Sequence, residues 1–380
     1  MTTLRPARTD ERGVALLVAL VAIVVIGGLV TGTFFAGRIE IGSGRNAMWS
    51  TQAAEAAESG LTSAFANWDA SWNDFAVAAD SAQPVGFPVV NNATMRYFQT
   101  IRRMRGGVYL ITARGEKVDR NGKVLGTRLL AQLGRMLLPW IDIGAAVTSK
   151  GETKVGGNAT IDGRNSSPAG WPACTAPDVA GIRTNDEVNQ NGSPQIYGSP
   201  PIKENDPGVV DSIFSGPFNT IKPLANITLA AGTYNSMGPA VTGDPAVCNR
   251  TLPLNWGEPS RGDGSLPECF TYFPIIYTPG DLHLTGGRGQ GLLLVQGDLR
   301  MQGGFEFTGV VLVLGKVITT ANSSKVTGAI LAGNVDFGDQ TSFGGTPVVA
   351  YSKCAIDAAL KAAGRAVPLS ARSWAQVAGR

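Results

Sequence analysis

A continuous run without charged residues, from Gly13 to Gly37, constrains most strongly what this chain can fold into. A helix rises about 1.5 Å per residue, so a run of this length can cross the roughly 30 Å hydrocarbon core of a membrane. The residues that follow the most apolar part include Phe34 and Phe35 and offer no small-x-small site for a signal peptidase. We therefore predict a membrane span at 13–37 that is retained in the mature protein.

The helical pattern continues beyond this span. Apolar residues recur at helical spacing as far as Phe75, while Glu55 and Glu58 fall elsewhere on the helical wheel. We predict one long helix over 13–75, half in the membrane and half packed on a globular head. Each glycine lowers the stability of a helix by up to about 1 kcal/mol relative to alanine, so we expect bending or local melting where six of them occur. These glycines are Gly27, Gly28, Gly32, Gly37, Gly42 and Gly44.

The span is preceded by a short charged leader, residues 1–12, which stops abruptly at Gly13. Here the sequence resembles the type IV pilin superfamily, and within it the PilX-type minor pilins, over residues 11–20 and again over 52–56. In that family a prepilin peptidase cuts after the glycine and methylates the new amino terminus. The resemblance therefore implies processing between Gly13 and Val14.

The sequence departs from the major pilins at Val18. Most major pilins carry a glutamate at this fifth mature position, and several minor or tip-located pilins lack it. A carboxylate inside lipid is costly unless it is paired, so a subunit without it inserts easily but lacks a charge that registers it on its neighbour. The resemblance thus implies a non-enzymatic subunit that initiates or decorates a pilus-like filament. The alternative for this region is an ordinary single-span anchor of an unrelated exported domain.

Charge and composition limit the partners. Charged residues make up only 16% of the chain, the net charge is +3, and the Lys and Arg residues are scattered, so we expect no nucleic-acid partner. Arg5, Arg8 and Arg12 precede the span, which favours a cytoplasmic amino terminus and an exported carboxy-terminal part. The resemblance places such a protein in the bacterial inner membrane, and in a pilus or at the cell surface after assembly. Its implied partners are other pilins and minor pilins, the prepilin peptidase and the pilus assembly machinery.

The residues after the helix predict a small head over 76–139. Strand-like segments occupy 95–104, 108–118 and 124–138, and Asn121-Gly122 between the last two is typical of a hairpin turn. A small antiparallel sheet packed on the helix would complete an α+β, pilin-like amino-terminal part.

From residue 140 the pattern changes to a repeat. Gly280-Asp281, Gly297-Asp298, Gly315-Lys316 and Gly333-Asn334 recur at spacings of 17, 18 and 18, and short apolar runs keep the same period. A fixed period of this size is typical of stacked rungs that bury one continuous core. We predict a mainly-β domain, a β-solenoid, over 140–354. The alternative is an antiparallel sandwich with coincidental spacing.

Four cysteines follow the span, and three of them lie in a stretch rich in Pro, Gly, Asn and Ser. We predict that residues 165–275 are long excursions from the solenoid. Disulfides are expected to stabilise them, because an exported domain faces an oxidising environment and these segments lack a dense core. Three connectivities are possible. Cys248 and Cys269 are close in sequence, so the loop between them closes at a small entropy cost. The preferred pairing therefore joins these two and leaves Cys174 with Cys354. Residues 355–380 are predicted to cap the domain.

No catalytic, cofactor-binding or metal-binding residues are predicted. Asp281 and Asp298 lie in the repeated turn, where Asp commonly bonds its own backbone, and the single histidine, His283, has no partner for a triad or a zinc site. Arg261-Gly262-Asp263 spells an adhesion tripeptide, which arises readily by chance. A second functional class remains open, namely a membrane-anchored β-helix enzyme or binding module that acts on polysaccharide.

Overall fold

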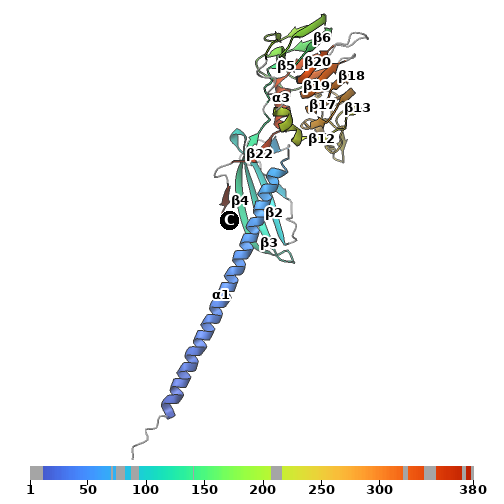
Figure 1. Ribbon diagram of the computed structural model, residues 1–380. Helices are drawn as coiled ribbons and strands as arrows, with labels where there is room; N and C mark the ends of the chain where they lie inside the picture. Colours follow the sequence, from blue (N-terminus) through green and yellow to red (C-terminus); the bar gives the residue numbers. More distant parts are fainter. Residues whose placement is uncertain are drawn as a thin grey trace, which may run out of the picture. The chain divides into compact units, whose positions relative to one another are not determined.

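A computed structural model of the chain divides into two compact units (Figure 1). We call the first the helix unit; it comprises Met1–Asn67, Val77–Gly134 and Pro368–Arg380. We call the second the stack unit; it comprises Trp68–Ala76 and Arg135–Val367. The structure describes residues 12–69, 72–73, 82–86, 94–139, 141–206, 216–319, 324–337, 348–369 and 374–377. Most of the predicted leader, residues 1–11, lies outside these ranges.

The predicted long helix is present as α1 (Arg12–Ala66), with 55 residues. It stays helical through the six central glycines, so the expected local melting is wrong. The physical reason is a comparison of free energies. Breaking a helical backbone hydrogen bond without forming a new one costs more than the unfavourable helix propensity of one glycine. The helix ends at Ala66, earlier than the predicted boundary at residue 75, and the backbone nitrogen and side-chain amide of Asn67 both donate to the Ser63 carbonyl oxygen at its last turn (2.9 and 3.2 Å).

An antiparallel sheet packs on the second half of α1 within the helix unit. Its strands are hydrogen-bonded in the order β1, β2, β3, β4, and β23 also pairs with β4. The predicted turn between β3 and β4 forms at Asn121-Gly122, where the Asp119 carboxylate accepts from the amides of Asn121 and Lys123 (both 2.9 Å). The strand bounds are β1 Ala82–Gly86, β2 Met95–Arg103, β3 Val108–Val118, β4 Val124–Leu137 and β23 Trp374–Val377, with a 3₁₀ turn η2 at Arg105–Gly107.

Small residues bring α1 and β3 into close contact. A Cβ on Gly115 would lie 2.0 Å from the Ala53 carbonyl oxygen and 2.4 Å from the Ala57 nitrogen, so no larger residue fits there. Ala53, Ala56 and Ala57 are fully buried at this contact. The side-chain amide of Gln99, from β2, donates to the Gly60 carbonyl oxygen and adds a polar attachment. The alanine-rich patch around 52–57 is therefore the contact surface of the helix.

The stack unit contains a 15-stranded parallel sheet whose strands lie one above another (Figure 1). Its strands are β5 Ala145–Ser149, β6 Thr153–Gly157, β7 Thr160–Asp162, β8 Ala180–Thr184, β9 Val188–Gly192, β10 Gln195–Tyr197, β11 Ile202–Lys203, β12 Ile227–Thr228, β13 Gly232–Met237, β16 Ile275–Thr278, β17 Leu282–Val295, β18 Leu299–Gln302, β19 Glu306–Thr319, β20 Lys325–Phe337 and β21 Val348–Tyr351. All of the described strands in this sheet pair in parallel, so the alternative of an antiparallel sandwich is wrong.

The register of this sheet follows the sequence repeat. Leu282 pairs with Leu299, Leu299 with Val317, and Val317 with Val335, which are the predicted spacings of 17, 18 and 18 residues. A second row places aliphatic side chains in register from one end of the sheet to the other, and all of them are buried except the half-buried Ile202. In order, this row contains Ile227, Ile276, Leu293, Val311, Ile330, Val147, Ile182 and Ile202. Such a row makes the core continuous across strands.

The order of the strands in space differs from their order in the chain. The chain enters the sheet in its middle, because β5 and β6 pair with β20, and β7 pairs with β21. Strands from 145–203 therefore extend the stack beyond β20, and strands from 227–351 build the rest. We call the pairing of β5, β6 and β7 with β20 and β21 the seam. It joins segments that are almost 200 residues apart in sequence.

Glycines turn the long strands at one corner of the stack. Gly309 and Gly328 pair in register, both with positive φ, and a Cβ on Gly328 would lie 1.9 Å from the Gly309 carbonyl oxygen. Only glycine combines this conformation with so close a backbone approach. The glycine-rich composition of the repeat is thus a requirement of the corner.

Two predictions for this region need correction. Residues 165–275 are not wholly excursions, since β8 to β13 belong to the stack, and every residue of β8 is buried. Residues 355–380 do not form one end cap: α3 (Lys353–Ala362) packs across β17, β19 and β20, and β23 joins the sheet of the helix unit. The reason is that the central strands are apolar on both faces, so Leu292 to Val295 need a cover on their outer side as well.

The remaining elements are η3 Lys222–Leu224, β14 Val241–Thr242, β15 Val247–Cys248, η4 Pro267–Cys269 and β22 Arg365–Pro368.

Candidate functional site

The first half of α1 presents an apolar surface that no described residue covers. Its large hydrophobic residues from Leu16 to Ile41 are all at least half exposed. The best 18-residue window of this helix has a mean hydropathy of 2.7, and among the described residues α1 is the one helix long and apolar enough to cross a membrane. Two hydroxyls in the segment are satisfied internally: Thr31 donates to the Gly27 carbonyl oxygen (2.8 Å) and Thr33 to that of Val30 (2.9 Å). This chemistry fits an apolar solvent.

The residues predicted to direct processing lie at the start of this helix. Gly13 and Val14 have helical backbone in α1, directly after Arg12, and the Val14 side chain lies outside the described parts. Val18 is 59% exposed, so its side chain is available to whatever surrounds the helix. The described part of this region therefore consists of the start of α1 followed by a membrane-compatible surface.

The carboxylates considered for catalysis have structural roles. The Asp281 Oδ1 atom accepts from the Asp298 backbone nitrogen (2.9 Å), and Asp298 Oδ1 accepts in turn from the Lys316 nitrogen (2.8 Å). Each aspartate thus lies in a turn, as the repeat predicts, but it accepts from the backbone of the next repeat and not, as expected, from its own. His283 lies exposed on β17 with Thr233 and Arg300 as register neighbours. Within the described ranges, no group of three or more His, Cys, Asp or Glu residues is placed to hold a metal ion.

The Arg261-Gly262-Asp263 triplet is not arranged for adhesion. The Arg261 guanidinium lies over the rings of Phe270 (3.9 Å) and Trp171 (4.8 Å) and donates to the carbonyl oxygen of Phe270 (3.1 Å). Burial lowers the pKa of Arg261 from its ordinary value. A partner cannot reach this guanidinium as it reaches an exposed arginine, so the triplet is a structural anchor of its loop.

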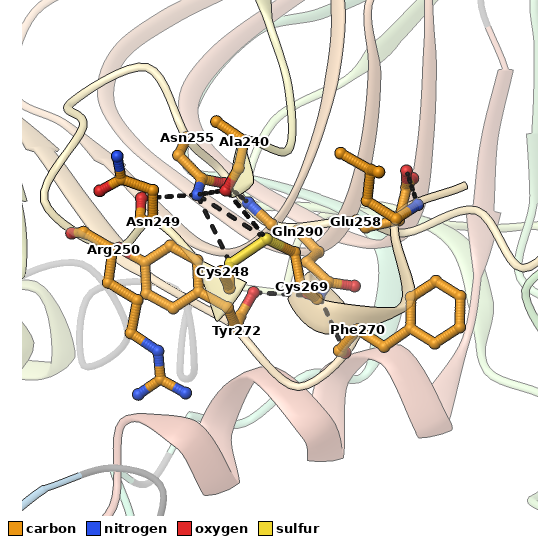
Figure 2. The surroundings of a disulfide bond; sticks show 12 residues. Ala240, Cys248, Asn249, Arg250, Asn255, Glu258, Cys269, Phe270, Tyr272 and Gln290 are labelled. Atoms are coloured by element: carbon orange, nitrogen blue, oxygen red, sulfur yellow. Dashed lines mark hydrogen bonds between the residues drawn. A yellow bond between two sulfur atoms is a disulfide. The ribbon is translucent and has the colours of Figure 1, made fainter. Parts of the chain in front are cut away.

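Two disulfides stabilise the stack unit, with the pairing preferred from the sequence. Cys174 is bonded to Cys354, and Cys248 to Cys269. Figure 2 shows that the second bond lies beside Asn255, whose buried amide donates to the carbonyl oxygens of Asn249 (2.7 Å) and Ala240 (3.0 Å).

A buried glutamine holds the same loop to the stack. The Gln290 amide, on β17, donates to the carbonyl oxygens of Tyr272 (3.0 Å), Phe270 (3.1 Å) and Cys269 (3.3 Å) (Figure 2). Sequence reasoning missed Asn255 and Gln290, because a single polar residue in an irregular or apolar stretch produces no periodic signal. A polar residue within the buried run of β17 was the only available hint.

No protein-family model matches this chain, and no curated protein sequence is significantly similar to it. Among solved structures, the crystal structure of the competence-associated pilin ComZ from Thermus thermophilus aligns with 86% of this chain and 97% of its own, at 12% sequence identity and a TM-score of 0.28. A likeness at this score carries no argument about function.

Proposed function

We propose that this chain is a non-enzymatic subunit of the type IV pilin class, anchored in the bacterial inner membrane by α1. The observation that carries the proposal is the division of α1 into an exposed apolar half and an alanine-lined half that packs on an antiparallel sheet. A charged leader that ends at Gly13 precedes this helix. Together these features supply the processing signal, the anchor and the head that such a subunit needs.

Within that class, a PilX-type minor pilin fits the sequence best. Residues 11–20 resemble that group, and Val18 replaces the glutamate of shaft pilins. The stack unit is also too large to repeat easily along a tightly packed filament, which favours low copy number. We infer a position at or near the filament tip, with other minor pilins, the prepilin peptidase and the inner-membrane assembly machinery as partners. After assembly, the protein would lie in the pilus or at the cell surface.

We also infer that the parallel sheet closes into a β-solenoid. The support is the repeated register and the change of direction at Gly309 and Gly328, which turns each long strand at the same height in its repeat. A solenoid displays flat outer faces on a rigid body, which suits a module for contact with other molecules. The stack unit would then act as the outward contact surface.

Processing supplies the direct test. Mature protein from cells with an active prepilin peptidase should begin at a methylated Val14, as read by amino-terminal sequencing and mass spectrometry. Gly13→Arg should block the cut and leave membrane insertion intact, whereas Gly27→Ala, a matched glycine change inside the span, should be processed normally. An intact Met1 in wild-type protein would contradict the pilin proposal.

Location tests the role of the subunit. Gold-labelled antibody against the stack unit should mark filament ends or the cell envelope. Regular labelling along the whole shaft would contradict a tip position. The second functional class, an anchored enzyme or binding module for polysaccharide, predicts turnover or binding of glycans by a protein that keeps Met1 and is absent from filaments.

A further inference from the structure

A polar hollow of about 600 Å³ opens on the stack unit, at one corner of β17 and β19. Its walls come from four separate segments of the chain, so it is built by the tertiary fold and has no local sequence signature. The residues that line it include Met237, Leu266, Arg288, Gly304 and Glu306. Its volume lies within the roughly 300–1,000 Å³ typical of sites for small molecules.

Arg288 is fixed in this hollow by a buried carboxylate. Its Nε atom donates to Glu258 Oε1 (2.8 Å), and one terminal nitrogen donates to Glu258 Oε2 (2.7 Å). Glu258 is fully buried, and its two oxygens also accept from the backbone nitrogens of Ser260 (3.0 Å) and Leu266 (3.1 Å). The bidentate pair therefore holds the guanidinium plane, and the donors that do not face Glu258 can serve a ligand.

Glu306 supplies an acceptor beside this donor. It pairs in register with Arg288 on the neighbouring strand, and adjacent strands lie about 4.8 Å apart. Its side chain is exposed at the hollow, where the glycine backbone around it carries no side chains that would block access. A rigid donor and an acceptor on adjacent strands suit a ligand with neighbouring hydroxyl groups, each of which can both donate and accept.

The charges argue against other ligands. The charges are balanced here, because Glu258 neutralises Arg288 and Glu306 has Lys325 as its register neighbour, so an inorganic anion would meet no excess of positive charge. A divalent cation would face the guanidinium and only one exposed carboxylate, which is too few oxygen ligands. Leu266, which is half-buried, adds an apolar wall that the C–H face of a sugar ring can cover.

We propose that this hollow binds a neutral saccharide, with Arg288 donating to and Glu306 accepting from adjacent hydroxyls. The site goes beyond the proposed pilus role and does not depend on it, because none of its residues belongs to α1 or its leader. A saccharide site would give the displayed stack unit a glycan ligand at a surface.

The test uses full-length protein in detergent on an array of neutral glucans, mannans, galactans, xylans and N-acetylhexosamine oligomers, followed by titration of the best oligomer. Wild-type protein should bind at least one of them saturably. Glu306→Ala should weaken binding about tenfold or more, the usual effect of losing a charged hydrogen-bond partner. Glu306→Trp should fill the hollow and abolish binding.

Lys325→Ala is the matched control. Lys325 is the next residue in the same register row, is exposed and does not line the hollow, so binding should stay within about twofold of wild type, which is close to 0.4 kcal/mol. Thermal unfolding of each variant shows whether the fold is kept.

No saturable binding anywhere on the array would overturn the proposal, as would binding that Glu306→Ala and Glu306→Trp leave unchanged. Binding of inorganic phosphate or Ca²⁺ in place of sugars would also overturn it. Normal processing at Gly13 with no sugar binding would reject this site alone.

Discussion

Cys174 and Cys354 are 180 residues apart in sequence, yet their Cα atoms lie 5.9 Å apart beside the seam of the stack. The same region is held by Ser166, whose nitrogen donates to the Tyr351 carbonyl oxygen (3.1 Å), and by Asn165, whose side-chain oxygen accepts from the Lys353 nitrogen (3.0 Å). These contacts join the two segments that chain connectivity leaves separate. The disulfide therefore acts at the place where the stack lacks a covalent connection.

Removing this disulfide should weaken the seam selectively. We expect Cys174→Ser with Cys354→Ser to cost about 2–5 kcal/mol of unfolding free energy, since the bond closes a very long loop. Hydrogen exchange should accelerate most in the strands from 145–203. Cys248→Ser with Cys269→Ser is the control, because that bond closes a loop of only 21 residues and its loss should leave exchange at the seam unchanged. Equal acceleration throughout the stack in the first variant would contradict a local role.

A side chain at position 115 should separate α1 from the sheet of the helix unit. Gly115→Ala places a Cβ against the Ala53 and Ala57 backbone, which cannot move away as a flexible side chain can. We expect a loss of more than about 2 kcal/mol, at the upper end of overpacking effects. Limited proteolysis should then cut the helix around 50–66. Gly44→Ala, with open space around its Cβ, should be tolerated, and equal resistance of both variants would argue against the close packing.

A charge in the middle of the apolar segment should impair the anchor. Ile23→Arg places a guanidinium near the centre of the span, where insertion costs about 2.5–3.5 kcal/mol. The fraction of protein that resists carbonate extraction from membranes should fall accordingly. Ile23→Leu keeps the apolar surface and should behave as wild type. If Ile23→Arg stays fully membrane-bound, the anchor must lie elsewhere.

Acid should destabilise the stack unit through Asp206. Hydrogen bonds from Lys203 and Arg183 lower the pKa of this carboxyl below its ordinary value of 3.8. A lowered folded-state pKa stabilises the fold above the unfolded value and loses that contribution as pH falls from about 4 downward. The unfolding temperature of Asp206→Asn should therefore lie below that of wild type at pH 7 and converge with it near pH 2. Asp263→Asn, at an exposed loop position, should show no such difference, and parallel curves for Asp206→Asn would exclude this linkage.

The sequence alone determined the elements that arise from local pattern and period. The charge-free run from Gly13 defined the exposed half of α1, because an apolar helix of that length is typical of a membrane span. The Gly-Asp repeat predicted the strand register at spacings of 17 and 18, since stacked turns require the same residue types at the same height. The cysteine spacing favoured the pairing that the structure has.

Only the tertiary structure decided how distant segments combine. Entry of the chain into the middle of the stack depends on the pairing of Ile330 with Val147, and hydrophobic burial between such strands has no dependence on their separation in sequence. The same is true of Arg288 and Glu258, whose ion pair forms across 30 residues because both side chains meet at one corner. Burial of α3 on the central strands likewise follows from the apolar outer face of Leu292 to Val295, a demand that the helix sequence itself does not reveal.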